Sequence, residues 1–152
     1  MTAHVEAGAI IKGPAIMGPN CFVAATAYLR DGVYLAEDCI VGPSCELKTT
    51  IMFPRSKVAH LSFVGDSLIG AGVNIEAGAI IANYRNELEN KRILIQADNH
   101  IIDTGTDKFG SLIGDDARIG ANAVIAPGSL ISAGQIVPRL GLIDQHPETQ
   151  PY

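Results

Sequence analysis

Three basic residues recur at a spacing that could build one anion-binding surface. Lys12, Arg30 and Lys48 are each 18 residues from the next, and each directly follows a long aliphatic residue. If 18 residues form one structural repeat, the three side chains lie in one column. Like charges stacked in this way repel one another unless an anion lies against them. We expect Arg30 and Lys48 either to bind a phosphate group or to face solvent, and Lys12 to face solvent.

A histidine and two asparagines could add proton transfer and substrate hydrogen bonds. His60 lies in K-V-A-H-L-S-F-V-G-D, and an imidazole near neutral pH can accept a proton. A lone histidine is more often structural than catalytic, so both roles stay open for His60. Asn74 and Asn83 flank the unit I-E-A-G-A-I-I-A, where asparagine could equally be a turn former. The histidines show no short metal-ligand spacing, so we expect no metal site.

Long aliphatic residues occupy every sixth position in the first third of the chain: Val5, Ile11, Met17, Val23, Leu29, Leu35, Val41 and Leu47. A period of six fits neither a helix nor one continuous strand, but it fits a short strand followed by a turn. Three such units make a triangular coil of about 18 residues, and repeats of this kind stack into a solenoid. The coils would stack at the usual strand spacing of about 4.8 Å. The period therefore predicts an all-β, parallel β-helix of hexapeptide repeats with the aliphatic side chains inside.

The same period predicts the organisation of the chain. We expect a single domain over residues 1–152, with coils over 5–86 and 113–138. The units 47–51 and 64–68 have five residues, after which the period resumes. The period breaks over 87–112, which predicts an inserted loop or hairpin, and long loops in compact repeats are usually functional or disordered. Residues 139–152 contain no repeat, and we expect a short C-terminal tail.

Composition excludes several classes of protein. The net charge of −5 disfavours nucleic-acid binding, which needs a basic surface. No apolar stretch is long enough for a membrane span, and no signal peptide is recognisable, so we expect a cytoplasmic protein with no membrane partner. Cys21, Cys39 and Cys45 fall on the small interior position of the repeat, which predicts buried free thiols rather than nucleophiles.

One segment resembles a known family. The run V-A-H-L-S-F-V-G-D, then V-N-I-E-A-G, then N-Y resembles the acetyltransferase domain of bifunctional N-acetylglucosamine-1-phosphate uridyltransferase/glucosamine-1-phosphate N-acetyltransferase. Upstream, Y-L-R-D and C-E-L-K resemble the same family. Downstream, D-T-G-T-D-K-F-G-S-L-I-G resembles archaeal-type sugar nucleotidyltransferases that have this domain. The resemblance covers nearly the whole chain. It implies a left-handed β-helix, acetyl-CoA as acyl donor, an amino-sugar 1-phosphate as acceptor, and a homotrimer with sites between subunits.

The resemblance also implies roles for individual residues. His60 corresponds to the general base, and the N–H of Ala77 to a donor that faces the thioester carbonyl. Tyr84 and Ala121, together with Ala77, fall on positions near acetyl-CoA. The positions that correspond to the sugar-phosphate site are Arg30, Lys48, Phe63, Asn74 and Asn83, with Lys91 or Lys108 as a lysine from a neighbouring subunit.

The chain departs from the family at three points. Phe63 replaces a tyrosine and so lacks one hydroxyl for the substrate, and sites built around such a bond discriminate strongly by it. Ala121 replaces a serine near acetyl-CoA, and the uridyltransferase domain is absent from this sequence. These departures leave two alternatives open: a non-catalytic β-helix for oligomerisation or regulation, or an acyltransferase that acts on another sugar substrate.

Overall fold

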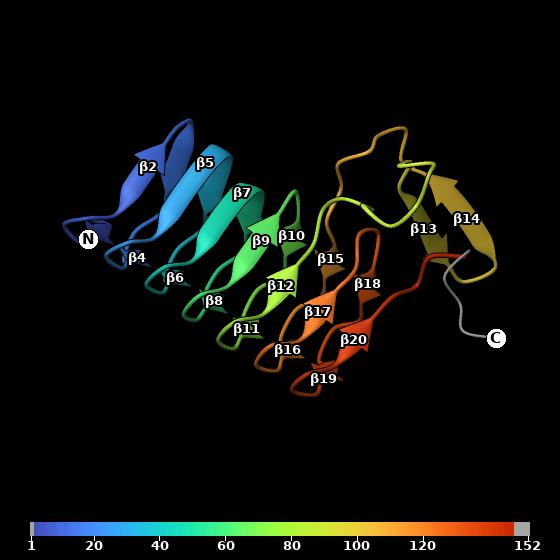
Figure 1. Ribbon diagram of the computed structural model, residues 1–152. Helices are drawn as coiled ribbons and strands as arrows, with labels where there is room; N and C mark the ends of the chain where they lie inside the picture. The colour runs from blue at the N-terminus through green and yellow to red at the C-terminus, as the bar shows by residue number, and fades with distance from the viewer. Residues whose placement is uncertain (1, 148–152) are drawn as a thin grey trace.

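The computed structural model describes residues 2–147, which form a triangular prism of stacked strands (Figure 1). These residues contain 20 strands and no helix. None of the described segments is therefore a helix able to span a membrane. The predicted parallel β-helix is confirmed, since every strand of the prism pairs in parallel with a strand of an adjacent coil.

Each coil contributes one strand to each of three faces. The first face is a sheet of β1 (His4–Val5), β4 (Phe22–Val23), β6 (Ile40–Val41), β8 (Lys57–Val58), β11 (Asn74–Ile75), β16 (Arg118–Ile119) and β19 (Ile136–Val137). The second face contains β2 (Ile10–Lys12), the first halves of β5 (Tyr28–Leu35) and β7 (Glu46–Met52), then β9 (Phe63–Gly65), β12 (Ile80–Ile81), β17 (Val124–Ile125) and β20 (Leu142–Ile143). The third face contains β3 (Ala15–Met17), the second halves of β5 and β7, then β10 (Leu68–Ile69), β15 (Leu112–Ile113) and β18 (Leu130–Ile131).

The core consists of one inward side chain per strand. Leu29, Leu35 and Val41 line successive faces of one coil, and none of them is exposed. The five-residue units keep this arrangement, since Leu47 and Met52 are both fully buried. Burying each such side chain stabilises the fold by about 1.5–3 kcal/mol. The free thiols of Cys21, Cys39 and Cys45 lie in the same interior, as predicted, and burial raises the pKa of Cys39 to about 11.

The corners need a left-handed backbone, which short polar residues and glycines supply at most positions and Arg55, Leu61 and Leu140 at others. Asn20, Asp38 and Asn122 all have φ between 55° and 60°. Asparagine and aspartate tolerate this region because their short side chains hydrogen-bond locally. Gly78, at φ 70°, occupies the corner between β11 and β12. The corner residues therefore fix where one face ends and the next begins.

The two ends of the prism differ. At the N-terminal end, Val5 and Ile11 are each 40% exposed, whereas Val23 and Leu29, one coil deeper, are fully buried. The C-terminal end is closed by the chain itself. Strand β20 lies in the segment expected to be a tail and pairs with β17, which extends the repeat beyond residue 138. The Gln145 carboxamide then binds both backbone groups of Leu130, at 2.8 and 3.0 Å, in the manner of another strand.

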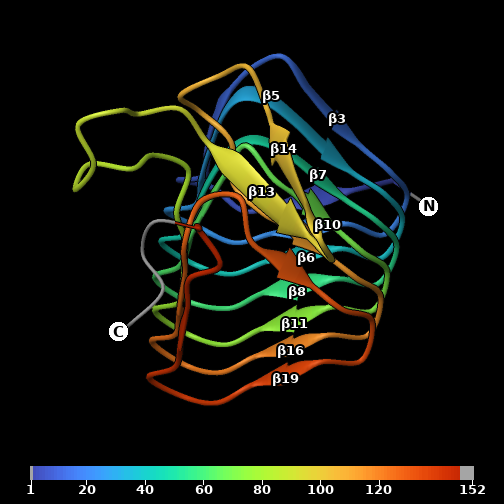
Figure 2. The same ribbon diagram turned by 90° about the vertical axis from the view of Figure 1, so that its right-hand side faces the viewer.

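The insertion forms an antiparallel hairpin. Strands β13 (Leu94–Ala97) and β14 (His100–Asp103) pair with each other and leave the prism between β12 and β15 (Figure 1). Strand β13 contacts β18 of the third face, and Ile93 beside it is fully buried. In Figure 2 the hairpin lies in front of the strands of the prism, and β13 is the strand that contacts β18. The insertion is therefore anchored to the last coils.

Two isoleucines on adjacent coils of the first face test the core. Replacing the buried Ile119 with alanine removes packed methylene groups, so we expect Ile119→Ala to lower the free energy of unfolding by about 2–5 kcal/mol in urea titrations. Ile136 is 65% exposed on the next coil. The matched variant Ile136→Ala should change the free energy of unfolding by less than about 0.5 kcal/mol. Equal losses would contradict the assigned inward positions.

A candidate active site on the second face

The basic column predicted from the 18-residue spacing is present. Lys12 pairs in register with Arg30, and Arg30 with Lys48, along the second face. Gly65 follows Lys48 in the same column. Three cationic side chains thus stand on one face at successive coil positions, where they could orient an anionic ligand.

Three carboxylates that sequence analysis did not single out lie against this column. The Arg30 guanidinium donates to Glu46 at 2.7 Å and to Asp31 at 2.6 Å, and the Glu46 contact raises the pKa of Arg30. Lys48 donates to Asp66 at 2.8 and 3.1 Å. Glu46 could have been found from its spacing, because a residue two before Lys48 shares its outward face. Asp66 lies at a turn, so its direction depends on the folded chain.

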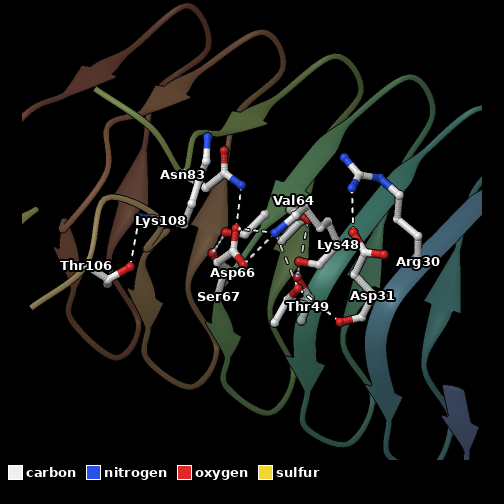
Figure 3. A network of polar contacts seen from close by, with 12 residues as sticks. Arg30, Asp31, Lys48, Thr49, Val64, Asp66, Ser67, Asn83, Thr106 and Lys108 are labelled. Carbon is white, nitrogen blue, oxygen red and sulfur yellow. Dashed lines mark hydrogen bonds and ion pairs between the residues drawn. The ribbon is translucent and has the colours of Figure 1, made fainter. Parts of the chain in front are cut away.

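Asp66 also joins Lys48 to Asn83 (Figure 3). The Asn83 carboxamide donates to one Asp66 oxygen, while the Lys48 ammonium donates to both. Gly65 leaves room for this contact, since a Cβ there would lie 2.6 Å from Asn83 Nδ2 and 2.8 Å from Phe63 Cζ. Phe63 is half-buried beside them, in register with Glu46. Arg30, Lys48, Phe63 and Asn83 therefore lie close together on the second face.

Tyr84 brings the two candidate lysines of the insertion to the edge of this face. The Lys108 ammonium lies 3.7 Å from the centre of the Tyr84 ring, and Lys91 lies 5.6 Å away. Cations favour this position over an aromatic face. The Lys91 ammonium also donates to the carbonyls of Asn86 and Leu88, within its own loop. Lys108 is thus the lysine that lies closer to Tyr84.

A second group of candidates forms a column at the corner between the first and second faces. The carbonyls of His60, Ala77 and Ala121 each accept a hydrogen bond from the coil that follows, at 2.8 to 3.0 Å. The three residues therefore occupy equivalent positions one coil apart, and the His60 side chain is exposed. Pro43 holds the same position on the preceding coil, since its carbonyl accepts from Leu61 N.

The N–H groups of Ala77 and His60 lack the carboxylate partner that two other members of this column have. Ala25 and Ala121 donate their N–H groups to the carboxylates of Glu6 and Glu76 on the preceding coil, at 2.7 and 2.9 Å. The corresponding residue below Ala77 is Ala59, which has no carboxylate. Within residues 2–147, no group accepts a hydrogen bond from the Ala77 N–H. This donor is available to an oxygen atom of a ligand.

Asn74 lies on the first face, whereas Asn83 lies at the edge of the second face, so the fold does not place these two asparagines together. It pairs in register with Arg118 and lines a cleft of about 210 Å³ with Glu76 and Arg139. Arg139 donates to Glu76 at 2.8 Å and lowers the pKa of that carboxyl. The corner column thus continues into a cleft that contains two arginines.

Comparisons with known proteins agree with the resemblance seen in the sequence. A family model described as the GMPPB C-terminal domain matches residues 11–105, more than half of the chain. A bifunctional sugar-1-phosphate nucleotidylyltransferase/acetyltransferase of Sulfurisphaera tokodaii is 37% identical over 131 residues, which cover 86% of this chain and 32% of the relative. The bifunctional protein GlmU of Methanococcus vannielii is 33% identical, with 86% and 31% covered. The chain spans about a third of the length of these curated relatives.

One solved structure gives a further likeness. The acetyltransferase domain of PglB from Neisseria gonorrhoeae FA1090 aligns with a TM-score of 0.42 and 18% identity, over 93% of this chain and 49% of that one.

The Lys48–Asp66 pair should be coupled more strongly than an exposed ion pair. Its side chains are 20% and 12% exposed, against 49% and 51% for Arg92–Asp103. In a double-mutant cycle of Lys48→Met and Asp66→Asn, we expect a coupling of about 1–3 kcal/mol in unfolding free energy. The matched cycle of Arg92→Met and Asp103→Asn should give less than about 1 kcal/mol. Similar couplings would contradict a preorganised network.

Proposed function

The chain belongs to the GMPPB C-terminal domain family, and we propose that it is an acetyl-CoA-dependent N-acetyltransferase acting on an amino-sugar 1-phosphate. One observation supports this more than any other. An exposed histidine and an unpaired N–H group lie in one corner column, beside a face with two ion-paired cations. Amide formation from a thioester needs a base, an oxyanion donor and a means of orienting the acceptor.

In the proposed reaction, the acceptor amine attacks the thioester carbonyl carbon. Neutral His60 takes the proton that the nitrogen loses as the new C–N bond forms. The carbonyl oxygen becomes an oxyanion, and the Ala77 N–H donates to it. Collapse of this intermediate breaks the C–S bond and releases the thiolate of CoA, which takes up the proton held by His60 and leaves the imidazole neutral again. No atom of the protein becomes covalently attached.

The second face would orient the acceptor. Arg30 and Lys48 would bind the sugar phosphate, and their carboxylate partners would hold them in place before the ligand arrives. Asn83 would bind a sugar hydroxyl, and Tyr84 with Lys108 would close this edge of the site. Phe63 offers no hydroxyl, so the sugar has one polar contact fewer than in the family pattern. Acetyl-CoA would follow the corner column, with its phosphates toward Arg118 and Arg139.

Trimerisation forms part of the proposal. Four outward side chains of the third face are more than a third exposed and lie in register: Ile16, Tyr34, Ile51 and Leu68. A contiguous apolar strip of this kind marks an interaction surface. We infer that two further copies of the chain cover it and complete the site.

Light scattering tests the oligomeric state. The wild-type mass should be three times that of the chain, and Leu68→Glu should reduce it to one chain because it places a charge in the apolar strip. Ile40→Glu, on the first face, is the matched control and should leave the mass at three chains. A wild-type monomer would overturn this part of the proposal.

The non-catalytic alternative rests on a separate observation, which is that Arg30 and Lys48 already have intramolecular anionic partners. A β-helix used only for assembly would not bind the acyl donor. Isothermal titration calorimetry with acetyl-CoA separates the two functions, since saturable binding supports the transferase and its absence supports the assembly module.

His60 is the first residue to test. If His60 removes the amine proton, His60→Ala should lower kcat by about 10²–10⁴-fold in a thiol-release assay with glucosamine 1-phosphate. His100, which is exposed on β14, provides the matched variant His100→Ala, which should retain full activity. Unchanged turnover in His60→Ala would exclude this residue as the base.

The Ala77 N–H can be removed with little change to the corner. Proline lacks the donor, and Pro43 already occupies the equivalent position on another coil. We expect Ala77→Pro to lower kcat by about 10²–10³-fold. Ala77→Gly retains the N–H and should keep most of the activity. If both variants lose activity equally, the donor role is wrong.

A further inference from the structure

The Arg85 side chain is charged, yet it is completely buried. Its two terminal nitrogens donate to the two oxygens of Asp144, at 2.9 and 2.8 Å. They also donate to the Pro127 carbonyl at 2.8 Å and to Glu87 at 3.2 Å. Two parallel bonds to one carboxylate fix both the distance and the plane of the guanidinium. Arg85 therefore joins the start of the insertion to the last coil, 59 residues away in sequence.

Stability alone does not explain this arrangement. A buried ion pair costs more free energy than an apolar pair of similar volume in many proteins. Within residues 2–147, the buried Arg85 Nε has no hydrogen-bond partner, so one of the hydrogen-bond donors of the guanidinium is buried without an acceptor. What the guanidinium supplies, and an apolar side chain would not, is a fixed direction.

The segment that Arg85 fixes contains two candidate site residues. Asn83 and Tyr84 directly precede it, where the chain leaves the prism. Before the insertion, the backbone pairing of this stretch of chain with the second face ends at Ala82, whose N–H donates to the Ile125 carbonyl. Phe109 N then donates to the Asn83 carbonyl as the chain returns. Between these points, residues 84–92 form no strand, so side-chain contacts hold them in place.

We propose that Arg85 is a positioning residue for the acceptor site, and that Asp144 of the C-terminal segment sets its direction. The two residues and the Pro127 carbonyl form a clamp, named here the Arg85 clamp. The clamp fixes the backbone of Asn83 and Tyr84. Asn83 then meets Asp66, and Tyr84 meets Lys108. The kinetic part of this proposal rests on the proposed acetyltransferase function.

Hydrogen–deuterium exchange of the full chain tests the clamp without an activity assay. The variants Arg85→Lys and Asp144→Asn each lose the two-pronged contact. Both should raise deuterium uptake about tenfold in rate over residues 83–93 and 105–111, because local opening controls exchange. Uptake over 20–58, in the early coils, should not change. Arg92→Lys, which alters an exposed ion pair with Asp103, is the matched control and should behave as wild type.

Kinetics then separates positioning from simple charge compensation. In Arg85→Lys, KM for the amino-sugar phosphate should rise about tenfold, with kcat changed less than about threefold. The double variant Arg85→Met/Asp144→Leu replaces the ion pair with an apolar pair and should recover the wild-type Tm. If Arg85 acts by positioning Asn83 and Tyr84, KM for the amino-sugar phosphate stays high in this double variant.

Two results would overturn the clamp. One is unchanged exchange over 83–93 in both single variants. The other is an apolar double variant with wild-type exchange and wild-type KM, which would show that only stability was at stake. If the wild-type chain acetylates none of the amino-sugar phosphates offered, the proposed function fails, while the exchange measurements still decide the clamp.

Discussion

Stacking of aliphatic side chains inside a triangular coil is the constraint on which the rest of the structure depends. Each strand is only two or three residues wide on its face, so it contributes one inward side chain. No single coil can bury that side chain alone, and it is covered only when another coil stacks above it. The exposure of Val5 and Ile11 at the open end, against full burial one coil deeper, shows this dependence directly. Period, register and the position of every corner follow from it.

The same constraint limits where chemistry can occur. Inward positions are filled and strand backbones are paired, so outward side chains and corner N–H groups are what remains. On the second face, the outward column stacks three cations, and the fold pairs two of them, Arg30 and Lys48, with Asp31, Glu46 and Asp66. At the corner, the missing carboxylate at Ala59 leaves the Ala77 N–H free for a ligand. The candidate site residues are therefore found at the repeat positions that depart from the pattern.

Departures from the repeat are also where long-range contacts become necessary. The insertion leaves the prism after Ala82 and has no coil to support it. Arg85, Ile93 and strand β13 tie it to the last coils, and the C-terminal segment contributes Asp144 and Gln145. Segments far apart in sequence therefore share one edge of the candidate site. The C-terminal segment acts as part of the scaffold, rather than as the tail that its lack of repeat suggested.

The sequence by itself determined the parallel β-helix, its two five-residue units, the interior cysteines and the basic column. Each of these depends on the spacing of residues along the chain, and that spacing can be read directly from the sequence. Tertiary structure alone decided the partners of the cations, the approach of Lys108 to Tyr84, the placement of Asn74 on the first face and the burial of Arg85. Those contacts join turns and an aperiodic insertion to distant coils, where the direction of a side chain depends on backbone angles that no spacing encodes. The position of His60 thus follows from the repeat, whereas the placement of Asn74 and the contacts of Asn83 depend on the fold.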